Sequence, residues 1–245
     1  MKTSNKMLLG LAIAVIILII YQLVSIKGVL KTEKIKGNGN IITTEETVSA
    51  FEKINSSNAE VYYHASDEYL AVISIDENLK EYVEVFEENN TLNIRTKKGY
   101  FILPTKFTVD VYCPVLTGVT MSGSGSFKSA DKIIVSTFES KVTGSGKIEG
   151  TIECDNYSAT ITGSGVITVD GSSNDANVSI TGSGDFNGND LNTRNATISI
   201  TGSGNANVFV SDNLKAKITG SGNINYSGEP KVDSNVSGSG RIRSI

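Results

Sequence analysis

Two aspartates in the second half of the chain are the strongest candidates for catalysis. Asp170 and Asp190 each lie 12 residues before a Gly-Ser-Gly triplet. If the triplets mark a repeat, the two carboxylates should lie on adjacent turns, about 5 Å apart. That spacing would suit a glycosidase, and some β-helix proteins cleave polysaccharides. The alternative is a pair of solvated turn acids, which we favour because such regular repeats lack the long loops that build a substrate cleft.

The other residues with chemical potential lack partners in the sequence. His64 is the only histidine, and neither a second histidine nor a cysteine lies near it to complete a zinc site or a catalytic dyad. We interpret it as a surface or half-buried strand residue. No triplet extends to a phosphate-binding motif, which needs a helix directly after the glycines. We therefore predict a protein that is not an enzyme, with no catalytic, cofactor-binding or metal-binding residues.

Seven Gly-Ser-Gly triplets indicate the architecture that would position these residues. Successive triplets are 21, 19, 19, 20, 18 and 18 residues apart, which is typical of stacked repeats. The triplets begin at Gly123, Gly144, Gly163, Gly182, Gly202, Gly220 and Gly238. Positive backbone φ, or close approach between repeats, explains glycine at these corners.

Three columns of residues appear when the seven repeats are aligned on the triplet. The residue two before the triplet is always aliphatic, the one directly before it carries a hydroxyl, and the one four after its first glycine is apolar. The aliphatic column comprises Met121, Val142, Ile161, Ile180, Ile200, Ile218 and Val236. This alternation predicts short strands with one buried face.

The fold class that fits is all-β, a right-handed parallel β-helix (solenoid) with rungs of 18–21 residues. A left-handed helix of hexapeptides would hold rungs close to 18 residues, and parallel crossovers are overwhelmingly right-handed. A calcium-binding solenoid is excluded because the residues that follow the triplets vary from Lys147 and Val166 to Arg241. The formal charge of −4 and the lack of a basic cluster in the repeats argue against nucleic acid as a partner.

The N-terminus predicts a membrane anchor. Residues 7–26 are apolar except for Gln22 and Ser25, and Lys2 and Lys6 precede them. This run is long enough to span a bilayer, so we expect one transmembrane helix that is an uncleaved signal anchor, with the β domain extracytoplasmic, in the periplasm or at the cell surface. Secretion after signal cleavage, and a buried core helix, are the alternatives.

Four segments follow from these patterns. Residues 1–26 are the signal anchor, 27–36 a charged stalk, 37–120 an irregular N-terminal β region of the solenoid, and 121–245 the regular β-helix. Gly37-Asn38-Gly39-Asn40 is interpreted as a degenerate early copy of the glycine corner. Strands are expected at Ala59–Ala65, Leu70–Ile75, Tyr82–Phe86, Thr91–Thr96 and Thr105–Tyr112.

Several of these stretches resemble one bacterial family. They are the run from Gly37 to Glu45, then Val48, Phe51 and Ile54, then Val111 to Pro114 with Leu116, and the repeated Thr-Gly-Ser-Gly. Over residues 35–245 the chain looks like the family called putative auto-transporter adhesin head domain, or GIN domain. The resemblance implies a β-helical extracytoplasmic domain of the cell envelope and transfers no catalytic residues.

Two functions are consistent with these observations. The first is a non-enzymatic, membrane-tethered β-solenoid that acts as an adhesin or envelope scaffold, whose partner is an envelope or cell-surface polymer or protein. The second is a carbohydrate-active β-helix enzyme, a polysaccharide hydrolase or lyase, that uses turn acids such as Asp170 and Asp190.

The two cysteines provide a test of the stacking. Counting from the triplets places Cys113 and Cys154 two rungs apart, about 9–10 Å, with their side chains on opposite strand faces. A disulfide requires α-carbons within about 7 Å, so we predict two free thiols.

Overall fold

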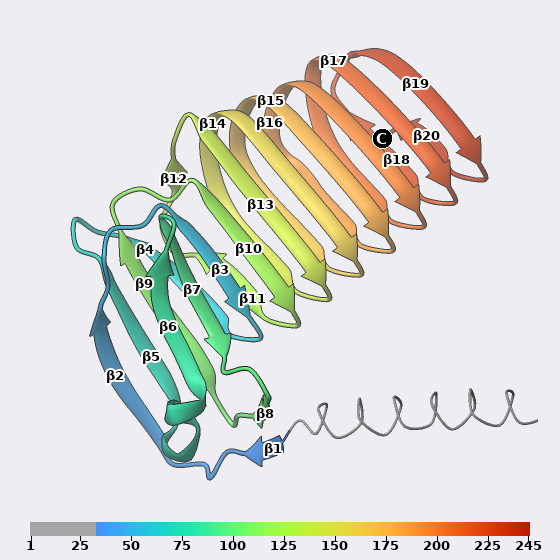
Figure 1. The fold of residues 1–245 in the computed structure, drawn as a ribbon. Helices are drawn as coiled ribbons and strands as arrows, with labels where there is room; N and C mark the ends of the chain where they lie inside the picture. The colour runs from blue at the N-terminus through green and yellow to red at the C-terminus, as the bar shows by residue number, and fades with distance from the viewer. Residues whose placement is uncertain (1–32) are drawn as a thin grey trace, which may run out of the picture.

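The computed structural model describes residues 33–245 as an elongated β-solenoid with an irregular N-terminal region (Figure 1). Apart from one short 3₁₀ helix, all regular elements of this part of the chain are strands. The N-terminal region comprises β1 (Glu33–Lys36), β2 (Ile41–Thr47), β3 (Lys53–Ser57), β4 (Glu60–Ala65), β5 (Leu70–Asp76), η1 (Glu77–Tyr82), β6 (Val83–Glu88), β7 (Thr91–Thr96), β8 (Tyr100–Leu103) and β9 (Phe107–Cys113). The repeats comprise β10 (Gly118–Gly123), β11 (Ser126–Ser129), β12 (Ile133–Ile134), β13 (Thr137–Gly144), β14 (Lys147–Gly163), β15 (Val166–Gly182), β16 (Asp185–Gly202), β17 (Asn205–Gly220), β18 (Asn223–Ser227), β19 (Lys231–Gly238) and β20 (Arg241–Ser244).

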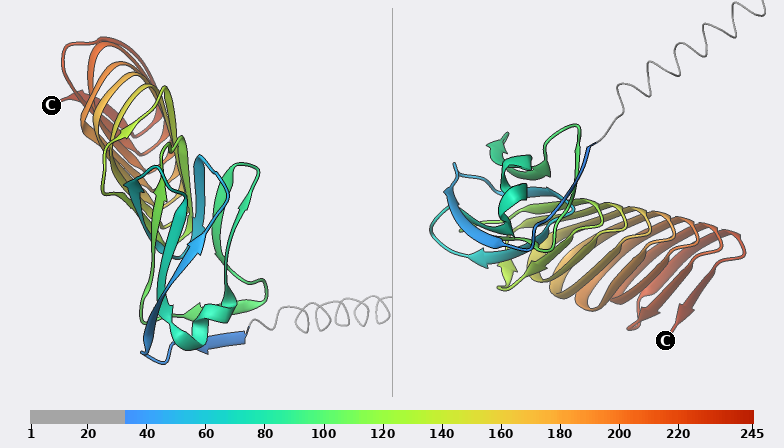
Figure 2. Two further views of the ribbon diagram at one scale, coloured as in Figure 1. Left: turned by 90° about the vertical axis from the view of Figure 1, so that its left-hand side faces the viewer. Right: turned by 90° about the horizontal axis from the view of Figure 1, so that it is seen from below.

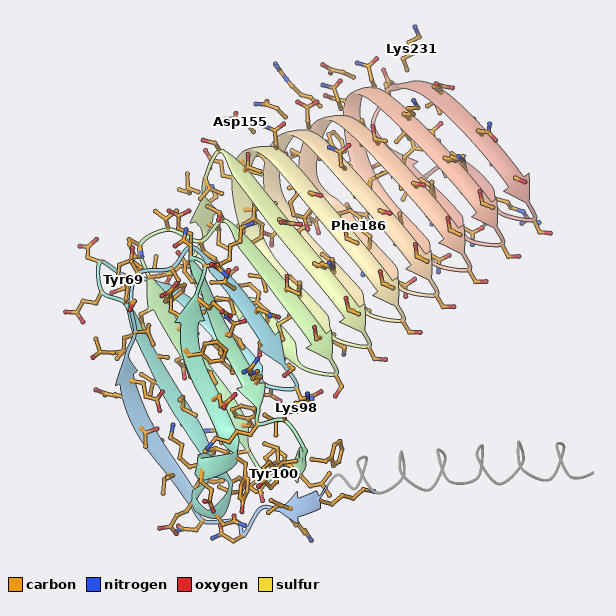
Figure 3. The ribbon with its side chains drawn as sticks, viewed as in Figure 1. Tyr69, Lys98, Tyr100, Asp155, Phe186 and Lys231 are labelled. Atoms are coloured by element: carbon orange, nitrogen blue, oxygen red, sulfur yellow. The ribbon has the colours of Figure 1, made fainter. Side chains whose placement is uncertain are left out.

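Each repeat forms one flattened rung with two sheet faces. The chain runs along the rear face directly after a triplet, bends, and returns along the front face to the next triplet, so that β14 to β17 each cover both faces (Figure 1). Neighbouring rungs pair in parallel, with Ile161 opposite Ile180 and Ile180 opposite Ile200. These three residues are buried, so the predicted register is confirmed. Phe186 also points into the interior, where its ring stacks near that of Tyr157 at 6.2 Å (Figure 3).

The Gly-Ser-Gly corner needs glycine for two reasons. Gly182 has a φ of +120°, and a Cβ built there would lie 2.4 Å from the carbonyl oxygen of Gly163 on the previous rung. The third residue, Gly184, would place a Cβ 2.5 Å from the side chain of Ile161. Between them, the N–H of Ser183 donates to the Gly163 carbonyl at 2.8 Å. The triplet is therefore a corner that stacks backbone directly on backbone.

In the N-terminal region the order of the rungs differs from the order of the sequence. β3 and β4 pair in parallel with β7 and β9 on one side and with β10 and β11 on the other. The rung formed by β3 and β4 therefore lies between two rungs that follow it in sequence. The rung of β7 and β9 is on one side of it, and the rung of β10 and β11 is on the other. Between β3 and β4, Asn58 has a φ of +62° and takes the corner position. Its side-chain oxygen accepts the N–H of Ser124 at 3.1 Å, as a glycine carbonyl does in later rungs.

The prediction that Gly37 to Asn40 form an early corner is therefore wrong. These residues connect β1 to β2, and β2 pairs antiparallel with β5. Further antiparallel pairs join β5 to β9 and β6 to β7, so strand pairing in the N-terminal region is mixed. The strand β1 pairs with β8, so residues 33–36 of the predicted stalk belong to the folded region.

Strands β2, β5 and β6 and the helix η1 close the N-terminal end (Figure 2). The core at this end is covered, since Phe51, Ile75 of β5 and Leu79 of η1 are fully buried. The buried carboxylate of Asp76 accepts the N–H groups of Gly39 and Thr105, each at 2.7 Å. These two hydrogen bonds connect the residues before β2 to the segment before β9.

The predicted anchor, residues 1–26, lies outside the described residues. Within residues 33–245, no helix is long and apolar enough to cross a membrane.

Candidate functional site

The two candidate catalytic aspartates lie at equivalent bends on adjacent rungs, as the spacing predicts. Asp170 and Asp190 directly precede Gly171 and Leu191, which pair across β15 and β16. Both aspartates are exposed, and within residues 33–245 neither has a hydrogen bond or an ion pair. Asp170 lines a shallow cavity of about 260 Å³ that Asp190 does not line. The two acids therefore do not converge in this cavity, as a pair that acts on one glycosidic bond would have to.

His64 forms a contact that its sequence neighbours do not reveal. Its Nε2 lies 3.0 Å from a carboxylate oxygen of Asp110, and its ring stacks on Tyr112 with centroids 4.7 Å apart. The parallel pairing of β4 with β9 brings these residues together across about 46 positions of sequence. The side chain is half-buried on the outer sheet surface, which agrees with the predicted strand histidine. Within residues 33–245, no cluster of three potential ligands could hold a metal ion.

The two cysteines are free thiols, as predicted, but their predicted placement is wrong. Three strand steps separate them, from β9 to β4, to β11 and to β14, because the β3–β4 rung is inserted between. Both also pack on the core, so they do not lie on opposite faces. Burial raises the pKa of Cys113 to about 12. Burial also raises the pKa of Cys154, against the opposing effect of a hydrogen bond with Ser173. Neither thiol has the lowered pKa of a nucleophile.

A uniform polar surface lies on the front face of the solenoid. Nine outward side chains in three rungs form a grid, which we call the hydroxyl face. Its members, rung by rung, are Ser158, Thr160 and Thr162; Asn177, Ser179 and Thr181; and Thr197, Ser199 and Thr201. They alternate with buried residues such as Ile161 and Ile180, which hold the grid on a flat sheet.

The side chains of the hydroxyl face are available to an external ligand. No side-chain hydrogen bond or ion pair involves any of the nine in the described part of the chain. None of them carries a charge. In the rungs on either side of the grid, Lys141 and Lys217 occupy the position of Thr160, Ser179 and Ser199. Charged side chains therefore begin outside the grid. Hydroxyl groups that both donate and accept are therefore presented every rung, about 4.8 Å apart.

The rear face of β16, β17 and β18 is organised differently. Its amide side chains bond to one another in ladders: Asn205 donates to Asp185 at 2.9 Å, and Asn223 donates to Asn205 at 3.0 Å. A parallel ladder joins Asn187, Asn207 and Asn225 at 3.0 and 2.8 Å. These amides use their hydrogen bonds to hold rungs together. The rear face of β16 to β18 is therefore held together by its own side chains, whereas the front face of β14 to β16 leaves its polar groups available.

A third ladder follows the bend opposite the triplets. Asn195 donates to Asp175 at 3.1 Å, and Asn213 donates to Asn195 at 2.8 Å. These residues lie seven positions before a triplet and are of types that favour turns, but the spacing alone does not reveal their hydrogen bonds. Nearby, a surface cavity of about 660 Å³ is lined by Ile134, Cys154, Asp155, Ser173 and Arg194, among others. Asp155 lies at the outer bend (Figure 3).

The sequence revealed only one column of the hydroxyl face. The sequence identifies the residues directly before each triplet as hydroxyls. It does not identify the columns three and five residues before the triplet, because Lys141, Glu139 and Lys217 interrupt these columns in the outer rungs. The alternation in stretches such as Thr160-Ile161-Thr162 was the signal that could have identified the grid.

A family model described as "Putative auto-transporter adhesin, head GIN domain" matches residues 50–230. The chain belongs to this family. The GIN-domain solenoid is also similar to solved structures. A protein from Parabacteroides distasonis described as "Putative lipid binding protein" is 31% identical, with a TM-score of 0.73, over 87% of this chain and 100% of that chain. A protein from Parabacteroides merdae described as "a putative adhesin" is 27% identical, with a TM-score of 0.69, over 87% of this chain and 99% of that chain.

A third solved structure shares the fold. A protein from Bacteroides fragilis described as "a putative adhesin" has a TM-score of 0.81 at 21% identity, over 86% of this chain and 100% of that chain. No curated protein matches the GIN-domain chain.

Proposed function

We propose that this GIN-domain protein is a non-enzymatic adhesin of the bacterial envelope that binds an extended polysaccharide along its hydroxyl face. The observation that carries the proposal is the grid of nine uncharged, unpartnered polar side chains on a flat sheet. A glycan presents hydroxyl groups at regular intervals, and one sugar of an extended chain advances by a distance similar to one rung. The family assignment and the names of the relatives support an adhesive role.

Affinity on such a surface comes from repetition. A single hydrogen bond that replaces water contributes only about 0.5–1.5 kcal/mol. Three rungs bind one polymer through linked contacts, and each further contact forms at a high effective concentration. We therefore expect weak binding of short oligosaccharides and much tighter binding of long chains.

The other candidates have less support. An enzyme would need converging acids, and Asp170 and Asp190 are exposed at a bend with no shared cleft. The lipid binding relative suggests an acyl chain as ligand, but Ser136, Asn174 and Arg194 give the 660 Å³ cavity polar walls. We propose further that residues 7–26 tether the protein, with its β domain extracytoplasmic.

A glycan array and co-sedimentation with insoluble envelope polysaccharides test this function. The full-length protein is compared with a triple variant, Thr160→Ala with Ser179→Ala and Ser199→Ala, which removes the middle column. We expect at least a tenfold loss of affinity. The matched control replaces Ser145, Ser164 and Ser183 with Ala, which removes three exposed hydroxyls at the triplet corners. Binding that both triple variants lose equally, or that neither loses, would contradict the proposal.

A further inference from the structure

Lysine side chains flank the hydroxyl face at both of its ends. On the front sheet, β13 precedes the three rungs of the face and β17 follows them (Figure 1). Lys141 of β13 lies opposite Thr160, and Lys217 of β17 lies opposite Ser199. Lys215 lies two residues before Lys217, on the same side of β17. All three lysines are exposed, and within residues 33–245 none has a hydrogen bond or an ion pair. Their charges are therefore available at the two ends of the grid.

The acid beside Lys141 is directed away from the hydroxyl face. Glu139 is on the same side of β13 as Lys141, but its carboxylate lies 3.6 Å from the amine of Lys53. Lys53 is on β3, which is separated from β13 by β10, on the side opposite the face. Gly118 of β10 stands between the two charges, and its missing side chain leaves a cavity of about 200 Å³ that Lys53 and Glu139 both line. Glu139 is therefore paired across Gly118, and the charge of Lys141 is left uncompensated.

Two further acids lie close to the hydroxyl face. Asp175, one column outside the grid at the bend end of β15, accepts a hydrogen bond from Asn195 at 3.1 Å. Asp233 of β19 lies opposite Lys215 and offsets that charge in part. In the middle column, by contrast, the residues opposite each lysine on both neighbouring rungs are uncharged. The lysines of the middle column are therefore the ones best placed to neutralise a bound anion.

The rear face has the opposite balance of charge. From β14 to β16 its strands carry Glu149 and Asp185 and, at the bend, Asp170, against Lys147. The chain as a whole has a formal charge of −4. An anionic polymer is therefore repelled by the rear face and by the net charge of the protein, whereas the lysines at the ends of the hydroxyl face attract it.

We propose that the polysaccharide on the hydroxyl face is anionic, and that Lys141 and Lys217 bind two of its carboxylate or phosphate groups at the two ends of the grid. This inference rests on the proposed function. The two lysines are four rungs apart, about 19 Å. Because one sugar advances by about one rung, they reach acidic groups on sugars four residues apart, and the hydroxyl face bonds to the sugars between. A lysine amine is a compact charge with three rotatable donors, so it suits either anion.

Pairs of polymers that differ only in charge test this inference. Poly(galacturonic acid) is compared with the same polymer after methyl esterification, and dextran phosphate is compared with dextran. Affinity is measured with the full-length protein in detergent micelles. We expect the charged member of at least one pair to bind at least tenfold more tightly, and added salt to weaken that binding. The pair with the larger difference identifies the anion as carboxylate or phosphate.

A double variant, Lys141→Gln with Lys217→Gln, locates the effect on the front sheet. It should lower the affinity for the preferred charged polymer at least fivefold more than the affinity for its neutral counterpart. The matched control is Lys128→Gln with Lys147→Gln, which removes two exposed lysines, and the same charge, from the rear face. The control should bind the charged polymer as the unchanged protein does.

This inference and the proposed function fail in different ways. Equal binding of charged and neutral polymers, equal losses in the two double variants, or retention of envelope polysaccharide without binding of either charged polymer would overturn the inference and leave the proposed function standing. Failure to bind any polysaccharide, or unchanged binding when the hydroxyls of the middle column are replaced by Ala, would overturn the proposed function itself.

Discussion

The two halves of this molecule are stabilised by different kinds of contact. From β13 to β20, the rungs repeat an aliphatic core column and a glycine corner, and from β15 to β18 amide ladders join them as well. From β1 to β9, each contact is made once, as with Asn58 at the first corner and Asp76 beneath the N-terminal cap. Repetition leaves the front face of the rungs free for binding, whereas the N-terminal half uses its polar groups to close the fold.

The largest effect should come from breaking the core column of the repeats. Ile180→Asp buries an unpaired carboxylate in a fully packed interior, so we expect a loss of about 4 kcal/mol or more in the free energy of unfolding. Urea denaturation followed by circular dichroism measures it. Thr181→Ser, one residue away on the hydroxyl face, is the control and should change stability by less than about 0.5 kcal/mol. Similar midpoints for the two variants would mean that the register is incorrect.

The glycine corner comes next. Gly182→Val combines positive φ with a clash against the Gly163 carbonyl, so we expect a loss of about 3 kcal/mol or more. Ser183→Ala removes only an exposed hydroxyl and should be nearly neutral. Thermal melts of both variants provide the comparison. Equal, small losses would show that the triplets are loops rather than stacked corners.

The contacts of the buried Asp76 carboxylate in the N-terminal half should respond to pH. Burial alone would raise the pKa of Asp76, but the N–H groups of Gly39 and Thr105 outweigh it and lower the pKa. Its stabilising effect is therefore present above the unfolded-state value, about 3.9, and is lost as pH falls through the folded value. Asp76→Asn should cost about 2 kcal/mol at pH 7. Chemical denaturation at pH 7 and at pH 3 should show this difference shrinking in acid; a difference that grows in acid would contradict the assignment.

The smallest effect concerns the amide ladders. From sequence alone we expect a substitution of Asn205 to be nearly neutral, but its side chain bonds to both Asp185 and Asn223. Asn205→Ala should therefore cost about 1 kcal/mol. Ser221→Ala, an exposed position near the same rung edge, is the control for a simple surface change. Identical melting temperatures would indicate that the ladder contributes nothing.

Sequence reasoning succeeded where a contact repeats. The column from Met121 to Val236 predicted the buried face because seven copies made chance alternation implausible. It did not reveal the inserted β3–β4 rung, since no period links β3 to β7 or β10. The contact between His64 and Asp110 was missed for the same reason: parallel pairing between distant strands leaves no local pattern. The corner at Asn58 could not be recognised from the sequence, because an asparagine stands where the later rungs have glycine.

The central claim is that polysaccharide binds to the front face of the solenoid and not to the rear face. Crosslinking from each face tests it. Thr181 lies on the hydroxyl face and Thr168 on the rear face, and both are exposed threonines. Each is changed to Cys in a full-length Cys154→Ser background, labelled with benzophenone and irradiated in the presence of envelope polysaccharide. We predict that the Thr181→Cys protein captures the polymer at least tenfold more efficiently than the Thr168→Cys protein. Equal capture from both faces, or stronger capture from Thr168→Cys, would contradict the account.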